Sequence, residues 1–117
     1  MALKDTAQEL QNLIFSGQLL EGFDKFYHPD VVMQENFEEP RQGKAYNREY
    51  EEKFLSSLEG FHGGKVTNLA VDEEKQVVFV ESWMDVTIKD VGRVKMGQVA
   101  AQQWQDGQII HERFYHA

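Results

Sequence analysis

Apolar residues recur at helical spacing in the first half of the chain. One stripe comprises Ala7, Leu10, Leu13 and Ile14, and a second comprises Leu19, Leu20, Phe23 and Phe26. Each stripe predicts a short helix, and the second must end before Pro29 because proline cannot continue a helix. A short strand is predicted over residues 31–37. After it, residues four apart predict a third amphipathic helix: Tyr46, Tyr50, Phe54 and Leu58.

The period of the apolar pattern changes to two after Gly63-Gly64, which is typical of strands. Strands are predicted over residues 65–71, 76–88, 92–105 and 108–116, with a strong hairpin signal at Asp106-Gly107. Helices followed by an antiparallel meander predict an α+β fold, with the helices packed on one face of the sheet. At 117 residues the chain fits a single domain, 1–117.

The strand predicted over 76–88 is apolar on both of its faces. Val77, Phe79 and Trp83 lie on one face, and Val78, Val80, Met84 and Val86 lie on the other. Since only one face can pack on the helices, we expect a homodimer through the face that carries Val78, Val80, Met84 and Val86. The alternative is a twisted monomeric sheet that leaves some apolar surface exposed.

Charge and composition make several classes of function unfavourable. A net charge of −8 disfavours nucleic acid and anionic membranes as partners. The chain has no cysteine, which excludes disulfides, zinc-thiolate sites and thiol nucleophiles. His111 and His116 would point to opposite faces of one strand, so we expect no metal and no cofactor. The first 15 residues lack the apolar core of a signal peptide, which predicts a cytoplasmic protein.

Three segments carry a family resemblance by their order and spacing: FYHPDVV after the second helix, PRQGK before the third, and WQDGQIIHERFY at the end. Over nearly its whole length the sequence resembles the nuclear transport factor two-like superfamily, and within it the SnoaL-like and ketosteroid-isomerase-like proteins. The resemblance implies a cone-shaped, cystatin-like α+β barrel, in which three helices pack on a strongly curved mixed or antiparallel sheet. It also implies an apolar pocket and, usually, a dimer. Because the superfamily includes several enzyme classes and non-catalytic members, fold alone does not define function.

The ketosteroid isomerases allow a comparison residue by residue. Their catalytic aspartate on the first strand corresponds to Glu35, with one residue fewer before Gly43. Their two hydrogen-bond donors to the enolate correspond to Leu10 and to Ala100, or to Val99 without a gap. None of these side chains can donate, and losing such donors costs several kcal/mol, so the resemblance disfavours steroid isomerisation by that mechanism.

Glu35 is nevertheless the candidate catalytic base. Met33, Glu35 and Phe37 share one face of the predicted strand, and two of the three favour burial. We therefore expect the Glu35 carboxylate to face the pocket near Tyr50 or Phe54, without a positively charged partner. Lost hydration would favour its protonated form and prepare it to abstract a proton. The alternative is a polar pocket residue bonded to a neighbouring strand or helix.

The rest of the pocket wall depends on the turn at Lys89-Asp90. If its loop has an even number of residues, the two long strands share one face, which carries Phe79, Glu81, Trp83, Met96, Gln98, Ala100 and Gln102. On the last strand the same face would carry Ile110, Glu112 and Phe114. With Met33, Tyr50 and Phe54, this face supplies the candidate ligand-binding residues Phe79, Glu81, Trp83, Met96, Gln98, Glu112 and Phe114. A slip of one residue would turn the whole set outward. The acidic stretches 35–39 and 49–52 are most simply solvated charge.

Three functions fit these observations. The first is a pocket protein that binds a hydrophobic small molecule, with an unspecified activity. The second is an acid-base enzyme, a cyclase, isomerase or dehydratase of a hydrophobic carbonyl compound, which uses Glu35 aided by Glu81 or Glu112. The third is a non-catalytic dimerisation module whose pocket is filled by its own aromatic residues. An open pocket separates the third from the others, and a carboxyl group exposed to it separates the second from the first.

Overall fold

The computed structural model describes residues 2–117, which form three helices and six strands. The helices are α1 (Leu3–Phe15), α2 (Leu19–Phe26) and α3 (Lys44–Ser57). The strands are β1 (Tyr27–Glu35), β2 (Arg41–Gln42), β3 (Leu58–Asp72), β4 (Val77–Ile88), β5 (Gly92–Gln105) and β6 (Gln108–Tyr115). The predicted α+β fold is confirmed, although β1 and β3 begin earlier than the sequence pattern suggests.

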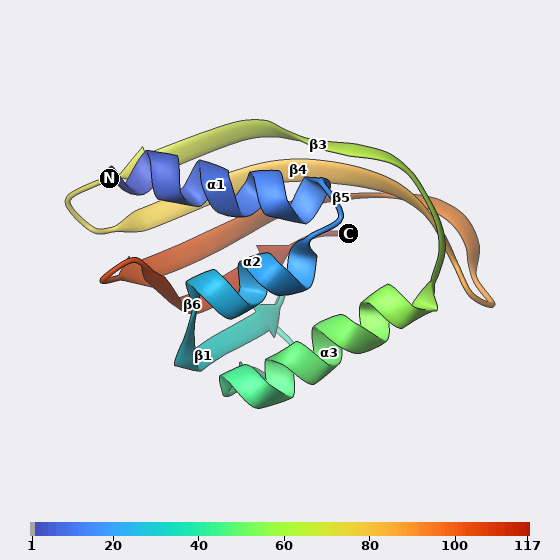
Figure 1. Cartoon of the computed structure of the whole chain (residues 1–117), viewed down its shortest axis with the longest axis horizontal. Coiled ribbons are helices and arrows are strands. Elements are labelled where there is room, and N and C mark those ends of the chain that lie inside the picture. The colour runs from blue at the N-terminus through green and yellow to red at the C-terminus, as the bar shows by residue number, and fades with distance from the viewer. Residues whose placement is uncertain (1) are drawn as a thin grey trace.

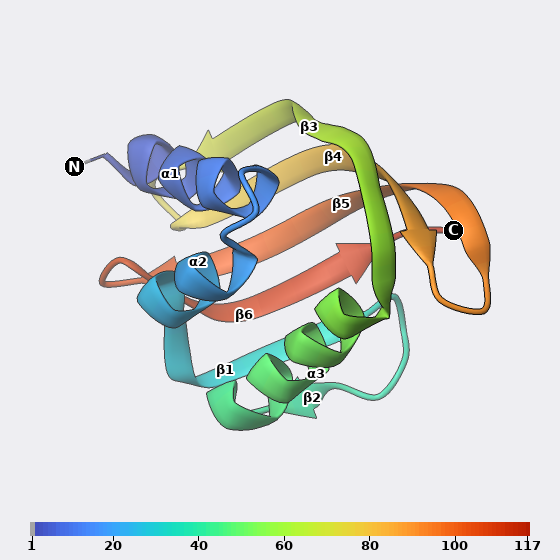
Figure 2. The ribbon, with the colours of Figure 1, turned by 45° about the vertical axis from the view of Figure 1, so that its right-hand side comes forward.

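All six strands belong to one sheet, in the order β2-β1-β6-β5-β4-β3. Neighbouring strands are antiparallel except for β1 and β6, which are parallel. The sheet curls around the helices, and β3 bends from the edge beside α1 down to the end of α3 (Figures 1 and 2). Three register shifts between β3 and β4 accompany this bend, as expected of β-bulges.

The hydrophobic core fills one end of the space between the helices and the concave face of the sheet. Leu10 and Phe23 pack there against Val31 and Ile109, and all four side chains are buried. The ring of Phe26 meets the buried Trp104 edge-on, with 6.0 Å between the centroids. The core does not fill the whole of this space, which also contains a cavity lined in part by the same core side chains.

The inward face of β4 is the opposite of the predicted one. Three residues, 89–91, join β4 to β5, so Ile88 pairs with Gly92 and Val80 with Ala100. With this odd loop length, Val78, Val80, Met84 and Val86 point to the concave side, where Val78 and Val86 are fully buried. The dimer face predicted from these four residues is therefore wrong. Phe79, Glu81 and Trp83 lie on the outer face instead, because side chains alternate along a strand.

The inward side of α3 differs from the predicted stripe at its N-terminal end. Tyr46 is 59% exposed, whereas the side chain of Asn47 is fully buried. The Asn47 amide donates hydrogen bonds to the carbonyl oxygens of Arg41 (3.0 Å) and Gly43 (2.8 Å), and its oxygen accepts one from Arg41 Nε (3.1 Å). At the helix start Gly43 has a φ of 93°, a conformation that favours glycine. These contacts fix α3 to β2, so that Glu51, one turn beyond Asn47, faces the cavity.

Candidate functional site

A cavity of about 500 Å³ lies between the concave face of the sheet and the three helices. Most of its wall is apolar, with Leu10 and Ile14 from α1, Phe54 from α3, and Met84 and Phe114 from the sheet. This volume is in the range of small-molecule sites. The cavity is open and not filled by aromatic side chains, which argues against a purely structural module with a filled pocket.

The strand register arranges the cavity floor in rows. Gln102 on β5 pairs with Glu112 on β6, and two positions along the strands Ala100 lies between Val80 and Phe114. Two positions further, Gln98 pairs with Ser82 on β4. Because side chains two positions apart share a face, the floor consists of a polar row at Gln102 and Glu112, an apolar row at Ala100, and a second polar row at Gln98 and Ser82.

Glu112 lies at the core end of this floor, and its side chain is 2% exposed. The Tyr27 hydroxyl donates to Glu112 Oε1, and Gln102 Nε2 donates to Oε2 at 2.7 Å. Burial raises the pKa of Glu112 to about 7, although both hydrogen bonds act in the opposite direction. Such a carboxyl group can give or accept a proton near neutral pH.

Tyr27 is itself buried and stacks on Phe23, with 4.5 Å between the ring centroids. Burial, together with the negative charge of Glu112, raises the pKa of the Tyr27 hydroxyl well above its ordinary value. Tyr27 therefore stays protonated and remains a hydrogen-bond donor. The sequence comparison places no donor at Leu10 or Ala100, and both of these side chains do line the cavity. The structure instead places the Tyr27 hydroxyl and the Glu112 carboxyl group, which accepts its hydrogen bond, at positions that this comparison did not point to.

Glu51 is a second carboxyl group on the cavity wall. Burial raises its pKa to about 7, the charge of Glu35 acts in the same direction, and the charge of Arg41 opposes both. The charge pattern of residues 49–52 predicts a solvated position for Glu51, and this prediction is wrong. Hydrophobic periodicity could not find it, because a side chain that faces a polar part of a cavity need not be apolar.

Glu35 also lines the cavity, but it is paired. Arg41 Nη2 lies 3.0 Å from Glu35 Oε2, and His116 Nε2 lies 3.0 Å from Oε1. The expected carboxylate without a positively charged partner is therefore wrong. Phe37 does not share its face, because β1 ends at Glu35, Asn36 has a φ of 47°, and the Phe37 ring is 84% exposed.

The remaining candidates divide between the cavity and other places. Tyr50, Phe54, Met96, Gln98, Glu112 and Phe114 line the cavity, and Arg41 lies 3.7 Å from the centre of the Tyr50 ring.

The other four predicted ligand-binding residues lie differently. Met33 is buried in the hydrophobic core and does not line the cavity. Phe79 and Glu81 lie on the outer face of the sheet, where Glu81 accepts hydrogen bonds from Thr67 and Asn68. Trp83 borders the cavity, but its ring lies 4.3 Å from Lys95 Nζ and its position in β4 belongs to the outer face.

Within residues 2–117 no group of three or more His, Asp or Glu side chains is placed to hold a metal ion. None of the helices in the same range is long and apolar enough to cross a membrane.

The comparisons with known proteins agree with this geometry. A protein of Mesorhizobium loti that bears the provisional name SnoaL-like polyketide cyclase is 27% identical, with a TM-score of 0.86 over 98% of this chain and 99% of that one. A cystatin-like protein of unknown function from Xanthomonas campestris is 18% identical, with a TM-score of 0.84 over 100% and 92% of the two chains. An LEH-like epoxide hydrolase of M. tuberculosis is 16% identical, with a TM-score of 0.77 over 98% and 82%.

The last two structures are similar in fold alone. No curated protein matches the chain. The sequence profile of the SnoaL-like domain matches residues 1–116, and the chain therefore belongs to the SnoaL-like family.

Proposed function

We propose that the protein binds a small, uncharged, largely apolar molecule that carries a carbonyl oxygen, and that it catalyses a proton transfer on this molecule. The observation that supports the proposal is the buried Glu112 carboxyl group, held by Tyr27 and Gln102 at the floor of an open cavity. Burying a carboxyl group lowers the stability of the folded protein. A buried carboxyl group that lines a cavity is therefore a candidate acid-base group.

The walls favour a neutral and apolar ligand. Four glutamates line the cavity: Glu35, Glu38, Glu51 and Glu112. Arg41 and His116 are already paired with Glu35, and Lys95 lies over the ring of Trp83. An anion would lose hydration there and gain little in return. A second, more apolar cavity of about 450 Å³ shares Ile14, Phe15, Leu19, Phe54 and Met84 with the first, which extends the apolar space available to a ligand.

The hydrogen-bond chain offers a route for the proton. Protonated Glu112 gives its proton to the Tyr27 hydroxyl oxygen, while the hydroxyl proton of Tyr27 passes to the carbonyl oxygen of the ligand. The carboxylate of Glu51 takes a proton from the carbon next to the carbonyl, so that a C–H bond breaks and an enol forms. Two carboxyl groups whose pKa values both lie at about 7 allow one to be protonated while the other is ionised.

The test uses the neutral ketone 2-octanone as a probe in D₂O, with NMR following the replacement of protons next to the carbonyl. The protein is expected to accelerate this exchange, and Glu112→Gln, Tyr27→Phe and Glu51→Gln are each expected to lower the rate at least tenfold. Glu73→Gln, in an exposed turn, is the matched control. Glu35→Gln should keep most of the activity, and a complete loss there would return the role of base to Glu35. No acceleration by the wild type would contradict the proposal.

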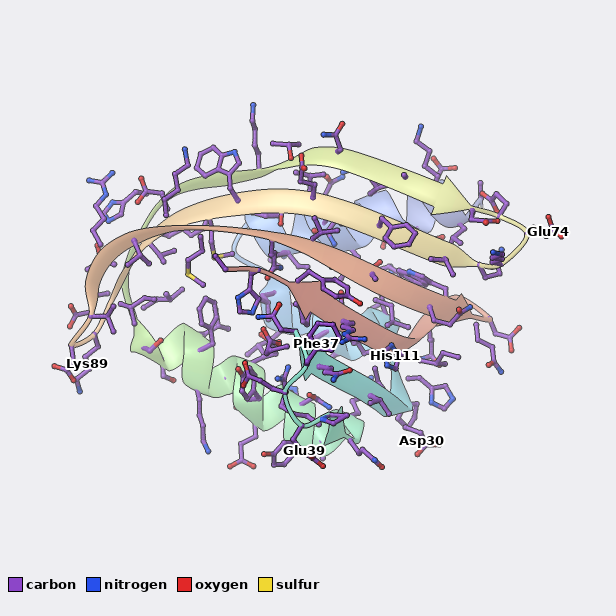
Figure 3. The ribbon with its side chains drawn as sticks, turned by 180° about the vertical axis from the view of Figure 1, so that it is seen from behind. Asp30, Phe37, Glu39, Glu74, Lys89 and His111 are labelled. Carbon is purple, nitrogen blue, oxygen red and sulfur yellow. The ribbon has the colours of Figure 1, made fainter. Side chains whose placement is uncertain are left out.

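We also propose a homodimer through the outer face of the sheet, in place of the face first predicted. Figure 3 looks onto this face, where no helix packs and where Phe37 and His111 lie. Phe79 is 47% exposed on it, between the small side chains of Ala70 and Ala101 on the neighbouring strands. A cytoplasmic location remains a prediction from the sequence, and cell fractionation would test it.

A further inference from the structure

We infer that the cavity contains a second polar subsite, formed by Gln11 of α1 and by Ser82 and Gln98 on the floor, which takes a second neutral hydrogen-bonding group of the ligand. The inference rests on the proposed function, because it concerns the same cavity and the same ligand. It adds a ligand class: an elongated uncharged molecule with an oxygen at each end and an apolar middle.

Two buried side chains that line the cavity have no hydrogen-bond partner in the protein. Gln11 is 6% exposed and Ser82 is 9% exposed, and both line the cavity. Neither side chain forms a hydrogen bond with another residue in 2–117. Every polar side-chain atom of this range that is fully enclosed does have a partner, so the polar atoms of Gln11 and Ser82 are not fully enclosed. Their polar atoms therefore reach the open space of the cavity. Since buried polar groups are normally paired, these two are available to a ligand.

The floor separates this subsite from Glu112. Gln98, which pairs with Ser82, and Gln102, which pairs with Glu112, are four positions apart on β5. Four positions correspond to about 13 Å along a strand. The row between them consists of Val80, Ala100 and Phe114, which offer no hydrogen bonds. A ligand that spans both polar rows needs an apolar segment across this middle row.

The second group is neutral because its partners are neutral. A serine hydroxyl and two glutamine amides can both donate and accept hydrogen bonds, and they carry no charge. A hydroxyl, carbonyl or ether oxygen fits such partners. A carboxylate or an ammonium group would lose hydration without a counter-charge among these three side chains, and Lys95 on the cavity wall is already placed over the Trp83 ring.

Two alcohols of equal length test the subsite. The oxygens of extended 1,8-octanediol lie about 11 Å apart, whereas 1-octanol has a single oxygen. Titrations followed by amide NMR shifts give a Kd for each alcohol with the wild type, Ser82→Ala, Gln11→Leu and the control Ser56→Ala on the exposed surface of α3. Ser82→Ala and Gln11→Leu are each expected to weaken the diol by about two- to tenfold, the worth of one hydrogen bond, without weakening 1-octanol.

The outcomes separate the subsite from the proposed function. Unchanged diol binding in both variants, or an equal loss for both alcohols, would overturn the subsite alone. Failure of both alcohols to bind the wild type would overturn the neutral-ligand proposal and the subsite together. In the ligand-free protein both variants should keep or raise the Tm, because no protein hydrogen bond is lost. A Tm lower by several degrees would reveal a structural role and would also overturn the subsite.

Discussion

At the scale of single residues, the protonation of Glu112 depends on the orientation of its neighbours. Trp104 Nε1 donates to Gln102 Oε1 at 3.0 Å, and this fixes the Gln102 amide with its NH₂ group directed at Glu112. Tyr27 donates to the other carboxyl oxygen. Both neighbours favour the ionised form, whereas burial favours the neutral form, and burial has the larger effect. A modest change, such as ligand entry, can therefore shift the proton.

The raised pKa of Glu112 predicts a pH-dependent stability. Its pKa rises from 4.5 to about 7 on folding, so between these values the folded protein binds a proton that the unfolded chain has released. The free energy of unfolding should therefore fall as the pH rises through this window, by on the order of 3 kcal/mol for this group. Urea unfolding from pH 4.5 to 8 measures the fall.

In Glu112→Gln the free energy of unfolding should decrease less over this pH range, because the amide does not titrate. Glu73→Gln should behave as the wild type. Glu51 adds a slope of the same sign, since burial raises its pKa as well. The variant curve is therefore expected to be flatter than that of the wild type but not flat. A Glu112→Gln curve parallel to the wild-type curve would show that Glu112 does not change its proton affinity on folding.

At the scale of elements, the sequence pattern located the strands well and their faces less well. The bounds of β5 agree with the prediction at both ends, because Gly92 and the Asp106-Gly107 turn delimit it. The error in β4 came from a single loop residue, Val91, since one extra position exchanges the inner and outer faces. No periodicity within a strand that is apolar on both sides can resolve this choice.

The error in α3 has a different physical cause. Tyr50 and Phe54 of the predicted stripe do line the cavity, but Tyr46 is exposed, and the inward side also carries Asn47 and Glu51, which apolar spacing could not indicate. The pairing of Glu35 with Arg41 and His116 could not be predicted from the sequence, for a further reason. It depends on the turn after β1 and on the position of the C-terminal residues, which are set by tertiary packing and not by local pattern.

Asn47 is predicted to be a main support of the cavity wall. Asn47→Ala removes two hydrogen bonds to carbonyl oxygens and leaves Arg41 Nε without its acceptor. Because the site is fully buried, unfolding in urea should show a loss of about 2–4 kcal/mol. Asn12→Ala, on the exposed face of α1, is the matched control and should change stability by less than about 1 kcal/mol. Equal effects at the two positions would contradict this role.

At the scale of the whole molecule, the two faces of the sheet have different tasks. The concave face and the helices enclose a cavity that keeps polar side chains without protein partners, at a cost in stability. The outer face has no helical cover and exposes large side chains, among them Phe79, Phe37 and Tyr115. Arg113 lies 4.3 Å from the centre of the Phe37 ring and 5.0 Å from that of Tyr115. Aromatic residues and arginine are enriched where proteins associate, so this composition fits an interface.

The proposed homodimer gives a prediction at this scale. A specific interface buries more than about 1,000 Å², and Phe79 would lie within it as an aromatic anchor. Sedimentation velocity at micromolar concentration should show a dimer for the wild type and a monomer for Phe79→Glu, because the substitution places an unpaired charge in the contact. Val91→Glu makes a similar change at a 67% exposed position in the β4–β5 loop and should remain dimeric. Met84→Glu is no test of this interface, since Met84 faces the cavity. A monomeric wild type, or a Phe79→Glu variant that stays dimeric, would contradict the proposed homodimer through the outer face.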